Sequence, residues 1–364
     1  MLIYLLLILI TIFGSQLFSN KNRDNGIDKS LIVTVIGMFL VFALRNSSVG
    51  RDVLGYKQMY LSFSNASFRD YNIYWTEAGF NILELICCHY LKISWQAFLA
   101  LVYGFICISY YRFLKNESMD ANYSIFIYIM MGYFIFDLSA IRTSLALSIC
   151  LFGVPYMREK NAKSVIKFII ITLIAAQIHT SAYIFAFYYI IFLFNYTRFK
   201  ELIYIILPII AVLVRSVIMR FATFEYKGEF QDASVNIGEN TILYFAILLL
   251  SFFIIYSNKS GYDLCYSDVD KVNADYNAKL VLPFNMVYIG VLLSVALGDS
   301  IFSRMAHYGL FYTSVLVPNV LFLMNRKDQL ICRVFFSLFL FVYYFYFKIK
   351  VNELDFLPYR FFWN

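Results

Sequence analysis

The sequence predicts an all-α polytopic membrane protein with about twelve transmembrane helices, in a range of about 11 to 13. Of the 364 residues, 61% are hydrophobic and only 15% are charged. The mean hydropathy of +0.69 exceeds that of a soluble domain with a polar surface. The apolar residues also form blocks of roughly spanning length between short charged connections. We therefore interpret residues 1–364 as a single integral membrane domain.

The apolar blocks follow one another along the whole chain. They cover approximately residues 2–19, 31–44, 95–114, 122–136, 138–157, 165–178, 181–194, 201–219, 241–257, 280–297, 305–323 and 331–347. No small-residue cleavage site follows the first block, so we expect a retained span and not a signal peptide. Residues 79–94 are apolar enough for a short re-entrant or interfacial helix.

The distribution of Lys and Arg predicts the orientation of these spans. One set of connections holds 17 basic residues in 70 positions: 20–30, 112–121, 158–167, 195–201, 258–279 and 324–333. The other set holds 13 in 108 positions: 45–94, 137–142, 179–180, 215–240, 298–304 and 348–364. Cytoplasmic loops carry the excess of basic residues. We therefore expect a main periplasmic segment at 45–94, a second periplasmic loop at 215–240, a cytoplasmic loop at 258–279 and both termini outside.

Composition and motifs argue against several functions. The formal charge of +7 comes from basic residues scattered through short loops, with no continuous basic stripe for nucleic acid. The six cysteines show no metal-ligand spacing. No catalytic triad or Walker loop appears, so an ATP-dependent enzyme is not expected. Any group to be transferred would have to arrive preactivated on a membrane-borne carrier.

The polar residues that could carry chemistry gather in the connections assigned to the outer face. Arg142 opens an apolar helix, where a guanidinium must be paired or face water. The alternatives are an arginine that snorkels to the interface or pairs with Asp137. His179 stands in a polar island between two apolar blocks and could act as a base near neutral pH. A histidine that merely ends a helix, with no role in catalysis, would give the same sequence pattern.

Two further groups lie in the same set of connections. Arg304 and His307 are about one helical turn apart, so they face the same way, although Arg304 could equally be a topological anchor. Glu77 follows Tyr74 and Trp75, an arrangement that suits stacking of sugar rings. An aromatic belt at the membrane interface would explain the same aromatic residues without a sugar.

Several arginines around an outward-facing cavity indicate a phosphate-bearing ligand. The guanidinium fork matches phosphate oxygens bidentately and keeps its charge when partly desolvated. The first such stretch lies between two apolar blocks. It contains Arg45, Arg51, Asp52 and Tyr56. A charged, turn-rich segment of this kind belongs at a membrane face.

Together these residues resemble the EpsG-type polysaccharide polymerases, part of the wider Wzy group of O-antigen and capsule polymerases. The resemblance runs from about residue 40 to 320, and its specificity lies in the order of the motifs. The motifs are Arg45 with Gly50-Arg51-Asp52 and Tyr56, then Glu77-Ala78-Gly79-Phe80, Ile141-Arg142-Thr143-Ser144-Leu145-Ala146, Ile178-His179-Thr180-Ser181-Ala182, and Arg304 through Pro318. The chain differs from the family pattern at three motif positions. Val53 replaces the usual Thr, Ala78 the usual Pro and Thr143 the usual Gln.

The resemblance implies a glycosyltransferase at the periplasmic face of the bacterial inner membrane. Such an enzyme joins undecaprenyl-pyrophosphate-linked repeat units into O-antigen or exopolysaccharide, with lipid pyrophosphate as the leaving group. The growing lipid-linked polymer is the donor and a single lipid-linked unit is the acceptor. The family leads us to expect inversion at the anomeric carbon and a reaction without a metal or other cofactor. It also implies a chain-length regulator as a protein partner.

The resemblance also implies roles for individual residues. Arg45, Arg142 and Arg304 would hold the pyrophosphate and stabilise the charge that grows there. His179, Asp52 and Glu77 are the candidate catalytic residues, with His179 or Asp52 taking the acceptor proton. The substrate-binding residues would be Arg51, Tyr56, Trp75 and His307.

Two rival functions share the many-span plan. An O-antigen ligase usually carries its large outside loop in the second half of the chain, whereas here the larger outside segment, 45–94, is in the first half. A flippase for lipid-linked sugars would show internal repeats and charges near the bilayer midplane. We find no convincing repeat, and the distinctive charges gather at one face, so the sequence favours the polymerase.

Overall fold

The computed structural model describes residues 1–17, 28–67, 70–71, 74, 76–159, 161–194, 204, 206–213, 215, 239–257, 271–297 and 303–364. All regular secondary structure in these ranges is helical, and an isolated β-bridge joins Arg45 to Phe361. The prediction of an all-α protein is therefore confirmed.

The described chain forms two units, which consist of Met1–Tyr183 with Leu330–Asn364, and of Ile184–Gln329. Helices α1 to α10 of the first unit are Leu2–Leu17, Lys29–Ala43, Val53–Ser62, Ala78–Leu85, Trp95–Glu117, Ala121–Met130, Tyr133–Ser139, Ile141–Leu151, Val154–Arg158 and Ala162–Ile178. It also holds most of α18, Arg326–Tyr343. The second unit holds α11 (Ile184–Phe194), α13 (Glu239–Ser257), α15 (Lys271–Leu297), α16 (Ser303–Leu310) and α17 (Thr313–Leu321).

Three helical stretches in the described residues are long and apolar enough to cross a membrane. They are Trp95–Glu117, Lys279–Leu297 and Arg326–Ile349, the last of which joins α18 to a π-helix at Tyr344–Ile349. Helices α6 and α7 qualify as a fourth span if they are taken together, although they meet at an angle of 62°. The chain is thus a membrane protein with several apolar helices, and the count of about twelve spans stays a prediction.

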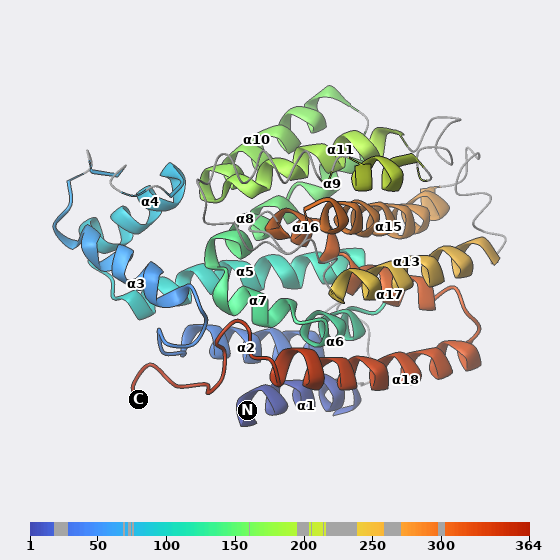
Figure 1. Ribbon diagram of the computed structural model, residues 1–364, viewed down its shortest axis with the longest axis horizontal. Helices are drawn as coiled ribbons and strands as arrows, with labels where there is room; N and C mark the ends of the chain where they lie inside the picture. Colours follow the sequence, from blue (N-terminus) through green and yellow to red (C-terminus); the bar gives the residue numbers. More distant parts are fainter. Residues whose placement is uncertain are drawn as a thin grey trace. The chain divides into compact units, whose positions relative to one another are not determined.

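Polar caps explain where α5, α6 and α10 of the first unit begin. The side chains of Ser94, Asp120 and Asn161 each accept a backbone N–H three residues on, at 3.2, 3.0 and 2.9 Å. Such caps satisfy donors that the helix itself leaves unpaired. Helix α5 then packs against α2 and α8, and α1 lies beside α2 (Figure 1).

The apolar blocks expected at 122–136 and 138–157 are both interrupted. Gly132, with a φ of +85°, separates α6 from α7 in the left-handed region that favours glycine. Helix α7 ends at Ser139, and α8 begins at Ile141 after the single residue Ala140. Arg142 therefore lies in the first turn of α8 and not in the middle of a continuous span.

The segment that contains Gly50 packs closely against this second break. Gly50 has a φ of +102°, and a Cβ on it would lie 2.6 Å from the carbonyl oxygen of Leu138. On its other side the segment pairs with the C-terminal tail, where the N–H of Gly50 donates to Asp355 O at 3.0 Å and that of Asn46 to Arg360 O at 2.8 Å. Only glycine fits here, because both the backbone angle and the contact exclude a side chain.

We expect Gly50→Ala to destabilise the protein by about 1–3 kcal/mol, because the new methyl group meets backbone atoms and the φ angle is strained. The readout is the unfolding midpoint of the detergent-solubilised protein. Gly55→Ala is the matched control, since no heavy atom lies within 4 Å of a Cβ at Gly55. Equal midpoints for the two variants would contradict the close packing of Gly50 on Leu138.

Candidate functional site

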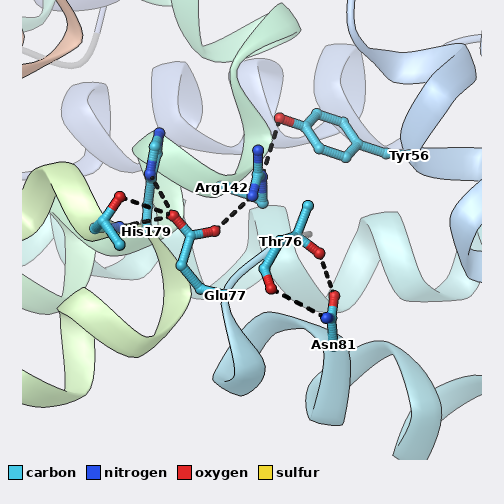
Figure 2. A network of polar contacts seen from close by, with 7 residues as sticks. Tyr56, Thr76, Glu77, Asn81, Arg142 and His179 are labelled. Atoms are coloured by element: carbon cyan, nitrogen blue, oxygen red, sulfur yellow. Dashed lines mark hydrogen bonds and ion pairs between the residues drawn. The ribbon is translucent and has the colours of Figure 1, made fainter. Parts of the chain in front are cut away.

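Glu77 occupies the N-cap position of α4, and its backbone is held by its neighbours. Its carbonyl accepts the N–H groups of Phe80 and Asn81, both at 3.1 Å. Asn81 also binds Thr76, with its side-chain amide donating to Thr76 O at 3.2 Å (Figure 2). The carboxylate of Glu77 makes no capping hydrogen bond to the helix and is directed at other parts of the chain.

The end of α10 supplies the surface that faces Glu77. His179 is the C-cap of this helix, and its N–H still donates to Ala175 O at 3.0 Å. The first turn of α4 rests on the last turn of α10, since a Cβ at Gly79 would lie 2.6 Å from both the carbonyl oxygen and the Cβ of Gln177. The glycine in the Glu77-Ala78-Gly79-Phe80 motif thus allows the close approach that brings Glu77 to His179.

The carboxylate of Glu77 joins two of the predicted residues (Figure 2). Its Oε2 lies 2.5 Å from Nη1 of Arg142, and its Oε1 lies 2.9 Å from Nδ1 of His179. Oε1 also accepts the N–H and the hydroxyl of Thr180, at 2.8 and 3.1 Å. The side chains of Glu77 and Arg142 are only 12% and 6% exposed. Three motifs that lie far apart in the sequence therefore meet at one carboxylate.

These partners determine the charge of Glu77. Burial by itself raises the pKa of a carboxyl group. The hydrogen bond with His179, the charge of Arg142 and the N–H of Thr180 outweigh burial and lower the pKa of Glu77 to about 2. Glu77 is therefore ionised at neutral pH. In this state it attracts positive charge and orients its neighbours, but it is a weak proton acceptor.

The first motif reaches the same site through Tyr56. Nε of Arg142 donates to the hydroxyl of Tyr56 at 3.3 Å, and the guanidinium lies 5.5 Å from the centre of that ring. Asp52 is the N-cap residue of α3, and its carbonyl accepts the N–H of Tyr56 at 3.2 Å. The N–H of Asp52 donates to Ser139 Oγ at 3.3 Å, which ties this turn to the break before Arg142.

Arg45 lies in a separate buried network. It has no exposed surface, and its Nη2 donates to the hydroxyl of Tyr103 at 2.8 Å. That hydroxyl in turn donates to the backbone oxygen of Asp137 at 2.6 Å. The Asp137 carboxylate accepts hydrogen bonds from the hydroxyls of Tyr110 (3.0 Å), Tyr128 (2.6 Å) and Ser144 (2.5 Å). Arg142 pairs with Glu77, so the alternative that it serves as the partner of Asp137 is not the arrangement observed.

The sequence pattern that defines the EpsG family matches residues 29–361. The chain belongs to the EpsG family. The match covers the motifs that meet at Glu77, and it confirms the resemblance seen in the sequence. Among curated proteins and among solved structures, none matches the chain. Membership indicates a polysaccharide-polymerase-like function of the glycosyltransferase kind.

The remaining predicted site residues of this EpsG-family chain are Arg51, Trp75, Arg304 and His307. Arg51 contacts the C-terminal tail, with Nε 3.8 Å from Oδ2 of Asp355, and its side chain is half exposed. Trp75 lies outside the described residues. Arg304 and His307 lie on α16 of the second unit, and His307 is buried. The substrate roles given to these residues stay predictions.

A second carboxyl group near the site, that of Glu84, was not predicted from the sequence. Glu84 lies on α4, seven residues or about two helical turns after the N-cap residue Glu77. It is completely buried, and this spacing was the signal that could have revealed it. Among the described residues, no group of three or more His, Cys, Asp or Glu could hold a metal ion. The expectation of a metal-independent reaction stays a prediction from the family.

The stability of the protein should depend on pH through Glu77. Its pKa is about 2 in the folded protein against an ordinary 4.5, so its charge stabilises the fold above about pH 4.5 and the effect is lost as the pH falls toward 2. We expect Glu77→Gln to lower the unfolding midpoint at neutral pH, with a difference from the wild type that shrinks at about pH 3. The exposed Glu353 provides the control, as Glu353→Gln. A pH-independent difference would contradict the ion pair.

The contact at Gly79 should control the coupling between Glu77 and His179. A double-mutant cycle of Glu77→Gln and His179→Gln should give a coupling of about 0.5–3 kcal/mol in thermal stability. In a Gly79→Ala background we expect this coupling to fall toward zero, because the methyl group separates α4 from α10. Gly104→Ala is the control, since its Cβ would meet only Phe39, at 3.8 Å. Undiminished coupling would show that Gly79 does not set the distance.

Proposed function

We propose that the chain is a polysaccharide polymerase that joins undecaprenyl-pyrophosphate-linked repeat units at the periplasmic face of the inner membrane. The observation that carries the proposal is the carboxylate of Glu77, which contacts both Arg142 and His179. The Glu77 carboxylate thereby lies between a cation that can hold phosphate and a histidine that can accept a proton. The polymeric product would be an O-antigen or an exopolysaccharide.

In the proposed reaction a hydroxyl of the acceptor unit attacks the anomeric carbon of the donor chain. The bond from that carbon to the pyrophosphate oxygen breaks, and the lipid pyrophosphate leaves with the electron pair. The hydroxyl proton passes to a base on the protein. Attack from the side opposite the leaving group inverts the anomeric carbon.

His179 is the base in this proposal. When Nδ1 donates its hydrogen to Glu77, Nε2 carries the lone pair that accepts the proton. The carboxylate then stabilises the imidazolium that forms, as an orienting acid does beside other catalytic histidines. Glu77 thus assists the base instead of accepting the proton, because its pKa of about 2 makes it a weak base. Asp52 is the alternative base.

Arg142 is the residue that would hold the departing pyrophosphate. Its charge is balanced by Glu77 in the absence of substrate, and a bound pyrophosphate would share or take over the guanidinium. Stabilising the charge that grows on a leaving group is often the largest contribution to catalysis. Arg304 would be a second pyrophosphate ligand. The full burial of Arg45 favours a supporting role through Tyr103 over direct contact with the lipid.

The acceptor and the rest of the donor would lie against neighbouring residues. Tyr56 already contacts Arg142 and would border the pyrophosphate, while Trp75 would stack on a sugar and Arg51 and His307 would bind further polar groups. A chain-length regulator would be the protein partner. The lipid bilayer would supply the carrier-linked substrates laterally, so their polyprenyl chains need not leave the membrane.

Deletion of the gene in its own host tests the proposal. We expect the surface polysaccharide, separated on a gel, to collapse from a ladder to a single repeat unit. Loss of all surface sugar would contradict it. Long chains on the carrier lipid would then indicate a ligase, and single units retained on the cytoplasmic side would indicate a flippase.

Complementation with variants tests the residue roles. His179→Gln removes the base and should reduce polymerisation about 100-fold or more, whereas Arg142→Lys keeps the charge but loses the fork that matches phosphate. His89→Gln and Arg326→Lys, at residues to which the proposal gives no role, are the matched controls and should restore the full ladder. A normal ladder from a His179 or Arg142 variant made at the normal level would refute the assigned role.

A further inference from the structure

Glu84 is a buried acid that the proposed reaction does not use. It lies near the end of α4, and none of its surface is exposed. Neither carboxyl oxygen has a hydrogen-bond partner among the described residues. Such groups are rare in folded proteins, and each calls for a structural or functional reason.

The geometry determines the protonation state of this acid. An ionised carboxylate without hydrogen bonds in an apolar interior would cost many kcal/mol, so the group keeps its proton instead. Burial accordingly raises the pKa of Glu84 well above its ordinary range, and the opposing influence of Arg142 does not offset it. Of the two acids at the start and near the end of α4, Glu77 is therefore ionised and Glu84 is neutral.

The groups that act on Glu84 come from three elements. Tyr60 belongs to α3, and Cys87 and Cys88 belong to the π-helix Ile86–Tyr90 that continues α4. These three are neutral in their ordinary states. Arg142 on α8 is the cation close enough to influence it. Arg142 therefore lies within the electrostatic reach of both Glu77 and Glu84.

We propose that Glu84 is a proton-binding positioning residue that sets the charge available at Arg142 for a donor pyrophosphate. The inference rests on the proposed function and adds to it a pH control of donor binding. With Glu84 protonated, Arg142 is balanced by the single charge of Glu77. Ionised Glu84 would add a second negative charge and repel the pyrophosphate. Binding of the anion and binding of the proton to Glu84 consequently favour each other.

The affinity for a polyprenyl pyrophosphate tests this coupling. The probe is farnesyl pyrophosphate, and the protein is the full chain in detergent at a series of pH values from neutral to alkaline. We expect the wild type to lose affinity at alkaline pH by about fivefold or more relative to Glu84→Gln, which cannot ionise. The two proteins should bind equally well at neutral pH. The ionisation of the probe itself cancels in this comparison.

Glu353→Gln serves as the matched control, because Glu353 is exposed, and it should follow the wild type at every pH. Glu84→Met should behave like Glu84→Gln, because it is also neutral and similar in size. Parallel affinity curves for the wild type and Glu84→Gln would overturn the proposal. A wild type that binds no pyrophosphate at any pH would refute the proposed function and this inference with it.

Infrared spectroscopy gives a readout that does not require activity. A protonated carboxyl without hydrogen bonds has a carbonyl stretch at higher frequency than an ionised one. We expect such a band at neutral pH, its loss at alkaline pH, and its absence from Glu84→Gln. Absence of the band from the wild type at neutral pH would overturn the inference even if the protein polymerises normally.

Discussion

The paired contacts of Glu77 with Arg142 and His179 are the interaction on which the site depends. The three residues come from the start of α4, the start of α8 and the end of α10. A nearly buried arginine without a counter-ion would be strongly destabilising, so Glu77 is required for Arg142 to occupy this position. The same carboxylate orients His179. One acidic residue therefore supports both the charge of Arg142 and the orientation of His179.

This arrangement requires the backbone to approach closely at two places. Gly79 lets α4 rest on α10, and Gly50 lets the first motif rest on the break between α7 and α8. Behind that break, Asp137 accepts three hydroxyl groups, and Tyr103 links its backbone to Arg45. Buried polar groups in a membrane protein must find partners within the protein. The Asp137 network thereby holds in place the helix start from which Arg142 extends.

The two acids of α4 have opposite protonation states for opposite physical reasons. Glu77 has a cation, a histidine and a backbone N–H around its carboxylate, and these stabilise the negative charge. Glu84 is fully buried, and the charge of Arg142 lowers its pKa less than burial raises it. A pair of carboxyl groups whose surroundings separate their pKa values in this way is characteristic of sites that handle protons and charge. The proposal of a site that binds an anionic substrate and moves a proton rests in part on this contrast.

The sequence by itself determined that the protein is an all-α membrane protein of the EpsG family, because apolar blocks and an ordered set of motifs are local features of the chain. It also identified Glu77, Arg142 and His179. Only the tertiary structure decided that Glu77 joins the other two, that Arg45 is enclosed beside Tyr103, and that Arg51 contacts the tail at Asp355. Glu77 lies 65 residues from Arg142 and 102 from His179 in sequence. Partners at such separations are selected by helix packing and by the pairing of buried charge, which local sequence patterns do not encode.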